Sequence, residues 1–208
     1  MEVIINGVNQ MMVNSKEGIS FADGLRSVMR QDPDVIMVGE IRDEETAAMA
    51  VRAALTGHKV YTTIHSTEPR EVYLRLEEMG IKSYLIRESL VGIISQRLIK
   101  MLCDSCKEEE IITYKDNKVK IYKKGDGCEK CNFTGYLGRA LIISVNEINN
   151  NLKKKLVKLY DNNTILTNIQ MVDNLNNLLL TGKISRLDYM EFIDREELDF
   201  DYEGSFKA

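Results

Sequence analysis

Two cysteine pairs of the form Cys-x-x-Cys, separated by 21 residues, place the strongest constraint on what this chain can fold into. They are Cys103 with Cys106 and Cys128 with Cys131, the only four cysteines among the 208 residues. Each pair can present two sulfurs on one side of a tight knuckle, and two facing knuckles complete a tetrahedral four-thiolate shell. Because such a shell leaves no open position, the spacing predicts a structural Zn²⁺ site that activates no water.

Two other uses of these cysteines are structural disulfides and a redox-active Cys-x-x-Cys. Disulfides are rare in the cytosol, and a redox motif needs only one pair. The N-terminus lacks the basic start and cleavage pattern of a secretory signal. We therefore expect a cytoplasmic protein in which zinc is the main interpretation of the four cysteines.

The first hundred residues alternate between strand and helix patterns. Val35–Val38 is a continuous apolar run ahead of Gly39, as in a buried parallel strand, and residues 59–64 form a second strand-like run. Apolar residues at helical spacing follow each run, from Thr46 to Leu55 and from Val72 to Met79. This order predicts an α/β fold with a parallel sheet flanked by helices.

The remainder of the chain divides into a cysteine region and a helical region. We expect a strand over residues 140–145, then a helix with one apolar face, then a second helix. The apolar positions of the first helix are Ile165, Ile169, Val172, Leu175 and Leu179, and those of the second are Leu187, Met190 and Ile193. The predicted organisation is thus residues 1–100, a tetracysteine module over 101–138 and a C-terminal subdomain over 139–208.

Charge and hydropathy exclude several classes of protein. The 28 basic and 32 acidic side chains give a net charge of −4, and 44% of the residues are hydrophobic. The chain has enough apolar residues to form a core, which argues against intrinsic disorder. It has no surplus of basic residues, which argues against binding to nucleic acid. The acidic surplus lies in the tail, residues 181–208. Charged residues interrupt the apolar stretch 85–102, so it does not predict a membrane span.

Three polar residues lie near the ends of the two predicted strands. Glu40 follows the first strand through Gly39, where a carboxylate could orient or deprotonate an attacking water. His65 follows the second strand, at the same edge if the strands are parallel. His58 precedes that strand and is interpreted as structural. By spacing alone, Glu40 and His65 are equally compatible with ordinary loop residues.

Several ordered motifs resemble those of the type II secretion and type IV pilus assembly ATPases. The run from Phe21 to Asp43, which includes Val38-Gly39-Glu40-Ile41-Arg42-Asp43, resembles their Walker B region. Residues 56–65 resemble their histidine box. Residues 96–98 and 135–139 resemble the segments that enter and leave their tetracysteine zinc module. The similarity extends from about Asn6 to Ile193.

The resemblance implies a RecA-like motor domain that works as a homo-oligomer, a hexamer, in which ATP turnover drives pilin assembly through a membrane platform protein. Glu40 would be the catalytic glutamate and His65 would contact the γ-phosphate region. Arg42 and Asp43 would lie in the adjoining loop, and Arg26 and Arg30 could serve phosphate or subunit contacts. ATP with Mg²⁺ is the implied cofactor pair, and the protein would lie peripherally on the cytoplasmic face of the membrane.

One family motif is absent from these 208 residues. No Gly-x-x-x-x-Gly-Lys-Ser/Thr sequence occurs, so the phosphate-binding amides, lysine and Mg²⁺-binding hydroxyl of a P-loop are missing. The sequence therefore reads as the C-terminal half of such an ATPase, from a truncated chain, a split gene or a degenerate copy. We expect negligible ATP turnover by this chain alone. The alternative is a non-catalytic, zinc-stapled module that docks the platform protein or neighbouring subunits.

Overall fold

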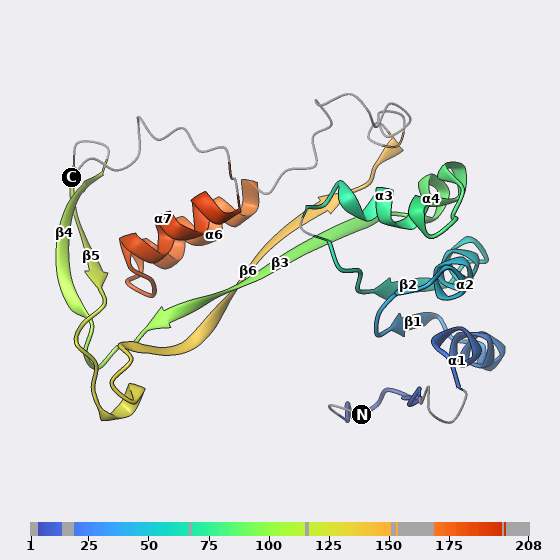
Figure 1. Ribbon diagram of the computed structural model, residues 1–208, viewed down its shortest axis with the longest axis horizontal. Helices are drawn as coiled ribbons and strands as arrows, with labels where there is room; N and C mark the ends of the chain where they lie inside the picture. The colour runs from blue at the N-terminus through green and yellow to red at the C-terminus, as the bar shows by residue number, and fades with distance from the viewer. Residues whose placement is uncertain are drawn as a thin grey trace. The chain divides into compact units, whose positions relative to one another are not determined.

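The computed structural model describes residues 4–13, 19–66, 68–114, 117–150, 153, 169–196 and 198. The chain forms two compact units, the first from residues 1–93 and 147–164 and the second from residues 94–146 and 165–208 (Figure 1). No helix among the described residues is long and apolar enough to cross a membrane. The apolar stretch 85–102, for which no membrane span was predicted, contains the end of a short helix followed by a strand.

The first unit alternates helices and strands. Its elements are α1 (Phe21–Val28), η2 (Met29–Gln31), β1 (Val35–Val38), α2 (Glu44–Leu55), β2 (Lys59–Thr62), α3 (Glu71–Glu78) and α4 (Ser83–Ser89). β1 and β2 pair in parallel, with Val35 opposite Lys59 and Val38 opposite Thr62. The predicted strand–helix–strand–helix order and the parallel pairing are confirmed.

β1 is buried on one face only. Ile36 and Val38 are 4% and 5% exposed, whereas Val35 and Met37 are 56% and 73% exposed. Helices α1 and α2 contact these strands, and alternate side chains of a strand point to opposite faces of the sheet. The expectation of a fully buried strand was therefore wrong for this chain, because only one face of the sheet is covered.

The second unit combines two β-ribbons with two helices. Its elements are most of β3 (Gly92–Leu102), β4 (Glu108–Tyr114), β5 (Asn117–Lys123), η3 (Glu129–Cys131), β6 (Tyr136–Glu147), α6 (Ile169–Leu180) and α7 (Arg186–Arg195). β3 pairs with β6, and β4 pairs with β5 in an antiparallel hairpin. The predicted strand over 140–145 is the central part of the longer β6.

One apolar cluster joins the helices to both ribbons of the second unit. It contains Ile99, Ile112, Ile121, Ile142, Met171, Val172, Leu175, Leu179, Ile184, Tyr189, Phe192 and Ile193. Val172, Leu175 and Leu179 confirm the predicted apolar face of α6, and Ile165 lies outside the described residues. The cysteine module and the C-terminal helices thus share one core.

The predicted apolar face of α7 was partly wrong. Leu187 is 69% exposed, and Tyr189, Phe192 and Ile193 form the buried stripe. Ser185 starts the helix with a capping box, accepting the Asp188 N–H while Asp188 accepts from the Ser185 N–H. With the helix starting there, the stripe at positions 189, 192 and 193 faces the core and Leu187 lies on the opposite side.

Candidate functional site

The parallel pairing of β1 and β2 brings Glu40 and His65 to one edge of the sheet. The Ile41 N–H donates to the Thr63 carbonyl at 3.0 Å, and the Thr63 hydroxyl donates to the Gly39 carbonyl at 2.6 Å. These bonds join the two segments that leave the strands. As a result, Nε2 of His65 lies 3.6 Å from Oε2 of Glu40.

Arg42 completes this strand-end cluster, which we define as Glu40, Arg42 and His65. Its Nε lies 2.6 Å from the same Glu40 oxygen. The carboxylate is 22% exposed, whereas the side chains of Arg42 and His65 are 70% and 82% exposed. A half-buried carboxylate with exposed nitrogen donors beside it can orient a water molecule, and the donors can face an anion.

A cleft of about 460 Å³ opens beside this cluster. It is lined by Ile41, Arg42, Ile64, His65, Arg75, Glu78 and Met79. Arg75 and Glu78 come from α3 and form an ion pair at 3.4 Å. The sequence analysis did not identify either residue as part of the site, because their helical spacing indicated only that they lie on the solvent side of α3.

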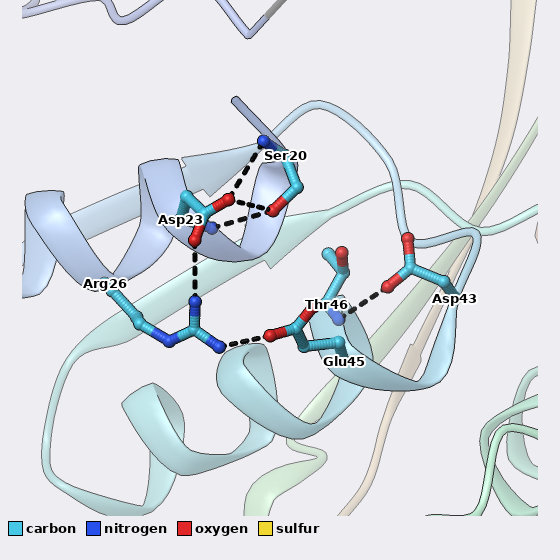
Figure 2. A network of polar contacts seen from close by, with 6 residues as sticks. All are labelled: Ser20, Asp23, Arg26, Asp43, Glu45 and Thr46. Carbon is cyan, nitrogen blue, oxygen red and sulfur yellow. Dashed lines mark hydrogen bonds and ion pairs between the residues drawn. The ribbon is translucent and has the colours of Figure 1, made fainter. Parts of the chain in front are cut away.

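Asp43 begins α2 rather than joining the strand-end cluster. Its carboxylate accepts the Thr46 N–H at 2.8 Å, which satisfies one of the free amides at the helix start (Figure 2). Glu44 and Glu45 follow in the first turn, where negative charge is favourable. The geometry therefore gives Asp43 a capping contact.

Arg26 links α1 to α2. Its guanidinium pairs with Asp23 at 2.8 Å and with Glu45, and Figure 2 shows it pointing toward both carboxylates. Hydrogen bonding to Glu45 is the main cause that raises the pKa of Arg26. Hydrogen bonds from Ser20 lower the pKa of the Asp23 carboxyl group. These bonds are also part of the capping box at the start of α1. Arg30 is exposed in η2.

His58 packs at the C-terminal end of α2. Its Nδ1 lies 3.0 Å from the Ala53 carbonyl, so the ring nitrogen is the donor in this bond, and it lies 3.2 Å from the Thr56 hydroxyl. Free carbonyls at a helix end are stabilised by such donors. This contact fits the structural interpretation of His58.

The four cysteine sulfurs converge in the second unit. All lie within 4.8 Å of one another, and the pairs Cys103–Cys128, Cys106–Cys131 and Cys128–Cys131 are 3.8, 3.8 and 3.9 Å apart. A regular tetrahedron with Zn–S bonds of about 2.3 Å has edges of about 3.8 Å. A disulfide needs about 2.05 Å. The four thiols therefore fit a four-thiolate metal site, and none of them forms a disulfide.

Backbone amides prepare one of these sulfurs to carry negative charge. The N–H groups of Cys128 and Gly135 donate to Sγ of Cys131 at 3.2 and 3.3 Å. Hydrogen bonding from the Cys128 amide is the main cause that lowers the pKa of the Cys131 thiol to about 6. Burial, followed by the neighbouring sulfurs, raises the pKa of Cys106 to about 12. Metal binding must therefore displace protons from this cluster.

Two glycines allow the knuckles to approach closely. A Cβ on Gly125 would lie 1.8 Å from the Cys106 carbonyl oxygen. Gly127 has φ +103°, and a Cβ there would lie 2.5 Å from the backbone of Phe133. Only glycine fits such positions without a backbone shift. These glycines lie next to the second cysteine pair and are a sequence signal that the spacing argument did not use.

Residues 1–186 match the family described as Type II/IV secretion system protein. The chain belongs to this family. It is 44% identical over 146 residues to the type II secretion system protein E of Dickeya dadantii, covering 67% of this chain. It is 40% identical over 168 residues to the type IV pilus assembly ATPase PilB of Thermus thermophilus, covering 76% of this chain.

The matched segment is a minor part of these family members. It spans 29% of the Dickeya protein and 19% of the Thermus protein. The crystal structure of the pilus retraction motor PilT with bound ADP aligns with a TM-score of 0.53 at 29% identity, over 83% of this chain and 43% of PilT. The ATPase DotB of Legionella pneumophila aligns with a TM-score of 0.52 at 24% identity. These likenesses support the predicted α/β ATPase fold.

Proposed function

We propose that this chain is the C-terminal portion of a motor ATPase that drives pilin or pseudopilin assembly in secretion, pilus formation or DNA uptake. The observation that carries the proposal is the strand-end cluster, in which Glu40 lies within 3.6 Å of His65 and 2.6 Å of Arg42. Its position after a parallel strand is where α/β proteins bind nucleotides. The names of the related proteins support the same function.

Each residue of the cluster then has a chemical role. Glu40 accepts a hydrogen bond from the attacking water and orients it or takes its proton. His65 and Arg42 donate hydrogen bonds toward the phosphate oxygens, and the positive charge of Arg42 offsets the charge that develops during transfer. When bound, ATP would supply the phosphoryl group, and Mg²⁺ would neutralise its charge. The P-loop that would bind them is not part of these 208 residues.

The four cysteines hold a structural zinc ion in this proposal. A closed four-thiolate shell supplies no catalytic water, so the ion stabilises the module between β3 and β6. The first hundred residues serve as the core portion, residues 101–138 as the zinc module and residues 139–208 as the C-terminal subdomain. The complete motor would be a hexamer on the cytoplasmic face of the membrane and would dock a platform protein.

Activity can be tested in a chimera. This chain would replace the matching segment of the Dickeya dadantii relative, and ATP turnover would be measured for the parent chimera and for Glu40→Gln. Because a general base typically contributes 10²–10⁴-fold, we expect turnover to fall by about a hundredfold or more. Glu88→Gln is the matched control, the same chemical change at an exposed residue of α4 outside the strand-end cluster, and it is expected to keep activity.

The isolated chain supplies the second arm of the test. We expect no measurable ATP turnover without a P-loop. An active chimera that is unaffected by Glu40→Gln would remove Glu40 from the reaction. A chimera that folds, binds its zinc and has no turnover would favour the non-catalytic docking module instead.

A further inference from the structure

The first cysteine knuckle, residues 103–107, is bonded to the turn between α6 and α7. The N–H groups of Cys106 and Lys107 both donate to the Cys103 carbonyl, at 3.2 and 3.0 Å, and these bonds close the knuckle. Immediately before it, the Leu102 N–H donates to the Lys183 carbonyl at 2.8 Å. The segment that supplies two of the four sulfurs therefore lies directly against the end of a helix distant in the chain.

Helix α6 ends at a glycine in the left-handed conformation. Gly182 has φ +67°, and its N–H donates to the Leu179 carbonyl at 3.0 Å, while the Lys183 N–H donates to the Leu178 carbonyl at 2.8 Å. This pair of bonds is a Schellman motif, which satisfies carbonyls left free at a helix end. The last turn of α6 contains no basic side chain. A cation that favours the negative end of the helix dipole must therefore come from outside that turn.

Lys107 supplies such a cation from the cysteine knuckle. Its Nζ donates to the Gly182 carbonyl at 2.9 Å and to Oδ1 of Asp104 at 2.6 Å. The same ammonium lies 4.4 Å from the ring centroid of Tyr122 in β5. The side chain of Lys107 is 15% exposed, so water screens these contacts little. The knuckle, β5 and the turn after α6 thus meet at one ammonium group.

Gly182 permits this close approach. A Cβ at this position would lie 2.3 Å from Cδ2 of Tyr122, so the ring packs directly on the backbone of the turn. A second lysine of the turn, Lys183, also reaches the knuckle, with its Nζ 3.2 Å from Oδ2 of Asp104. The side chains of that pair are 43% and 63% exposed, and such exposed pairs contribute little. Lys107 is therefore the main charged link between the knuckle and the turn.

The position of this ammonium depends on the fold of the knuckle. Lys107 directly follows Cys106, one of the four candidate ligands, and its own N–H is part of the knuckle. In four-thiolate sites, metal binding and local folding are coupled. The contact of Lys107 with Gly182 should therefore be only as stable as the metal site beside it.

We propose that Lys107 is a positioning residue that couples the four-cysteine site to the end of α6. With the metal bound, the knuckle holds the ammonium on the Gly182 carbonyl and fixes the turn into α7. When the metal is removed, the knuckle loosens, the ammonium leaves the carbonyl and the end of α6 frays. This inference rests on the zinc ion of the proposed function, and it does not depend on ATP turnover.

Hydrogen exchange of the full chain, read by mass spectrometry, tests this coupling. Zinc content is measured first, and wild type is then compared before and after treatment with a strong chelator. We expect metal removal to speed exchange at residues 181–183 about fivefold, as fits the loss of one charge-assisted hydrogen bond. Residues 171–176, earlier in the same helix, are the internal reference and should not change.

Variants of Lys107 separate this coupling from a general loss of stability. Lys107→Met removes the ammonium, so residues 181–183 should exchange fast with zinc bound and no faster after chelation, while residues 128–135 still respond to the metal. Lys107→Arg should keep the response at 181–183, because a guanidinium also donates to carbonyls and stacks on aromatic rings. Lys130→Met is the matched control at an exposed lysine beside Cys131, and it should behave as wild type.

Three results would contradict the proposal, each at a different step. Zinc-bound wild type whose residues 181–183 do not respond to chelation would overturn the coupling and leave the zinc site standing, and this result requires no variant. A full metal response at residues 181–183 in Lys107→Met would overturn the role of Lys107. Purified protein without zinc would overturn the zinc site of the proposed function, and this inference with it.

Discussion

The two candidate sites of this chain are built in opposite ways. The four sulfurs of the second unit lie within 4.8 Å of one another, and backbone amides of two residues donate to one of them. The strand-end cluster of the first unit instead joins a half-buried carboxylate to Arg42 and His65, which are 70% and 82% exposed. The four sulfurs are arranged to bind one ion on all sides, whereas the strand-end cluster is exposed to a ligand.

The same contrast extends to the surrounding cores. In the second unit, helices and both ribbons enclose a cluster of twelve buried side chains. In the first unit, β1 buries alternate residues and leaves Met37 73% exposed. A metal site needs rigid surroundings that hold its ligands in place. The geometry of an exposed cluster instead depends on the ligand or protein that contacts it. Three measurements test this difference.

Metal removal should have the largest effect. A strong chelator, or Cys128→Ser, is expected to abolish the zinc content and to speed hydrogen exchange in residues 102–107 and 128–135 by tenfold or more, because metal binding and local folding are coupled. Exchange in α2 should not change. Lys130→Ala is the matched control, since this exposed side chain lies beside Cys131. Freshly purified protein that contains no zinc would contradict the assignment.

Neighbouring residues of β1 should differ strongly in their effect on stability. Ile36→Ala is expected to lower the free energy of unfolding by about 3 kcal/mol, since it removes a buried side chain. Met37→Ala should change it by less than about 0.5 kcal/mol, since that side chain is exposed. Urea denaturation followed by circular dichroism measures both. A comparable loss for Met37→Ala would mean that this face of the sheet is covered in solution.

The smallest effect concerns the acid titration of Asp23. Its pKa lies below the usual 3.8 because the Ser20 hydroxyl donates to its carboxylate. A lowered pKa stabilises the fold above the unfolded value, and this contribution disappears as the pH falls through the lower, folded value. Wild type should therefore lose slightly more thermal stability than Asp23→Asn between pH 5 and pH 2. Identical pH profiles for the two proteins would show that the capping box contributes no such linkage.

Much of both sites was readable from short stretches of sequence. Cys103 with Cys106 and Cys128 with Cys131 stand at knuckle spacing, and local backbone geometry is sufficient to pair their sulfurs. The helical spacing of Val172, Leu175 and Leu179 likewise depends on neighbours along the chain. These features were predictable because the interactions that produce them span only a few residues.

Other features arose only from tertiary packing. The 3.6 Å approach of His65 to Glu40 depends on the register of two strands, and the pairing of Arg26 with Glu45 depends on how α1 packs against α2. The exposure of Leu187 and Met37 depends on which faces other elements cover. The sequence by itself determined the elements, the cysteine knuckles and the order of the motifs. Tertiary structure decided which charged groups meet and which apolar faces stay open, because those outcomes require residues distant in the chain to come into contact.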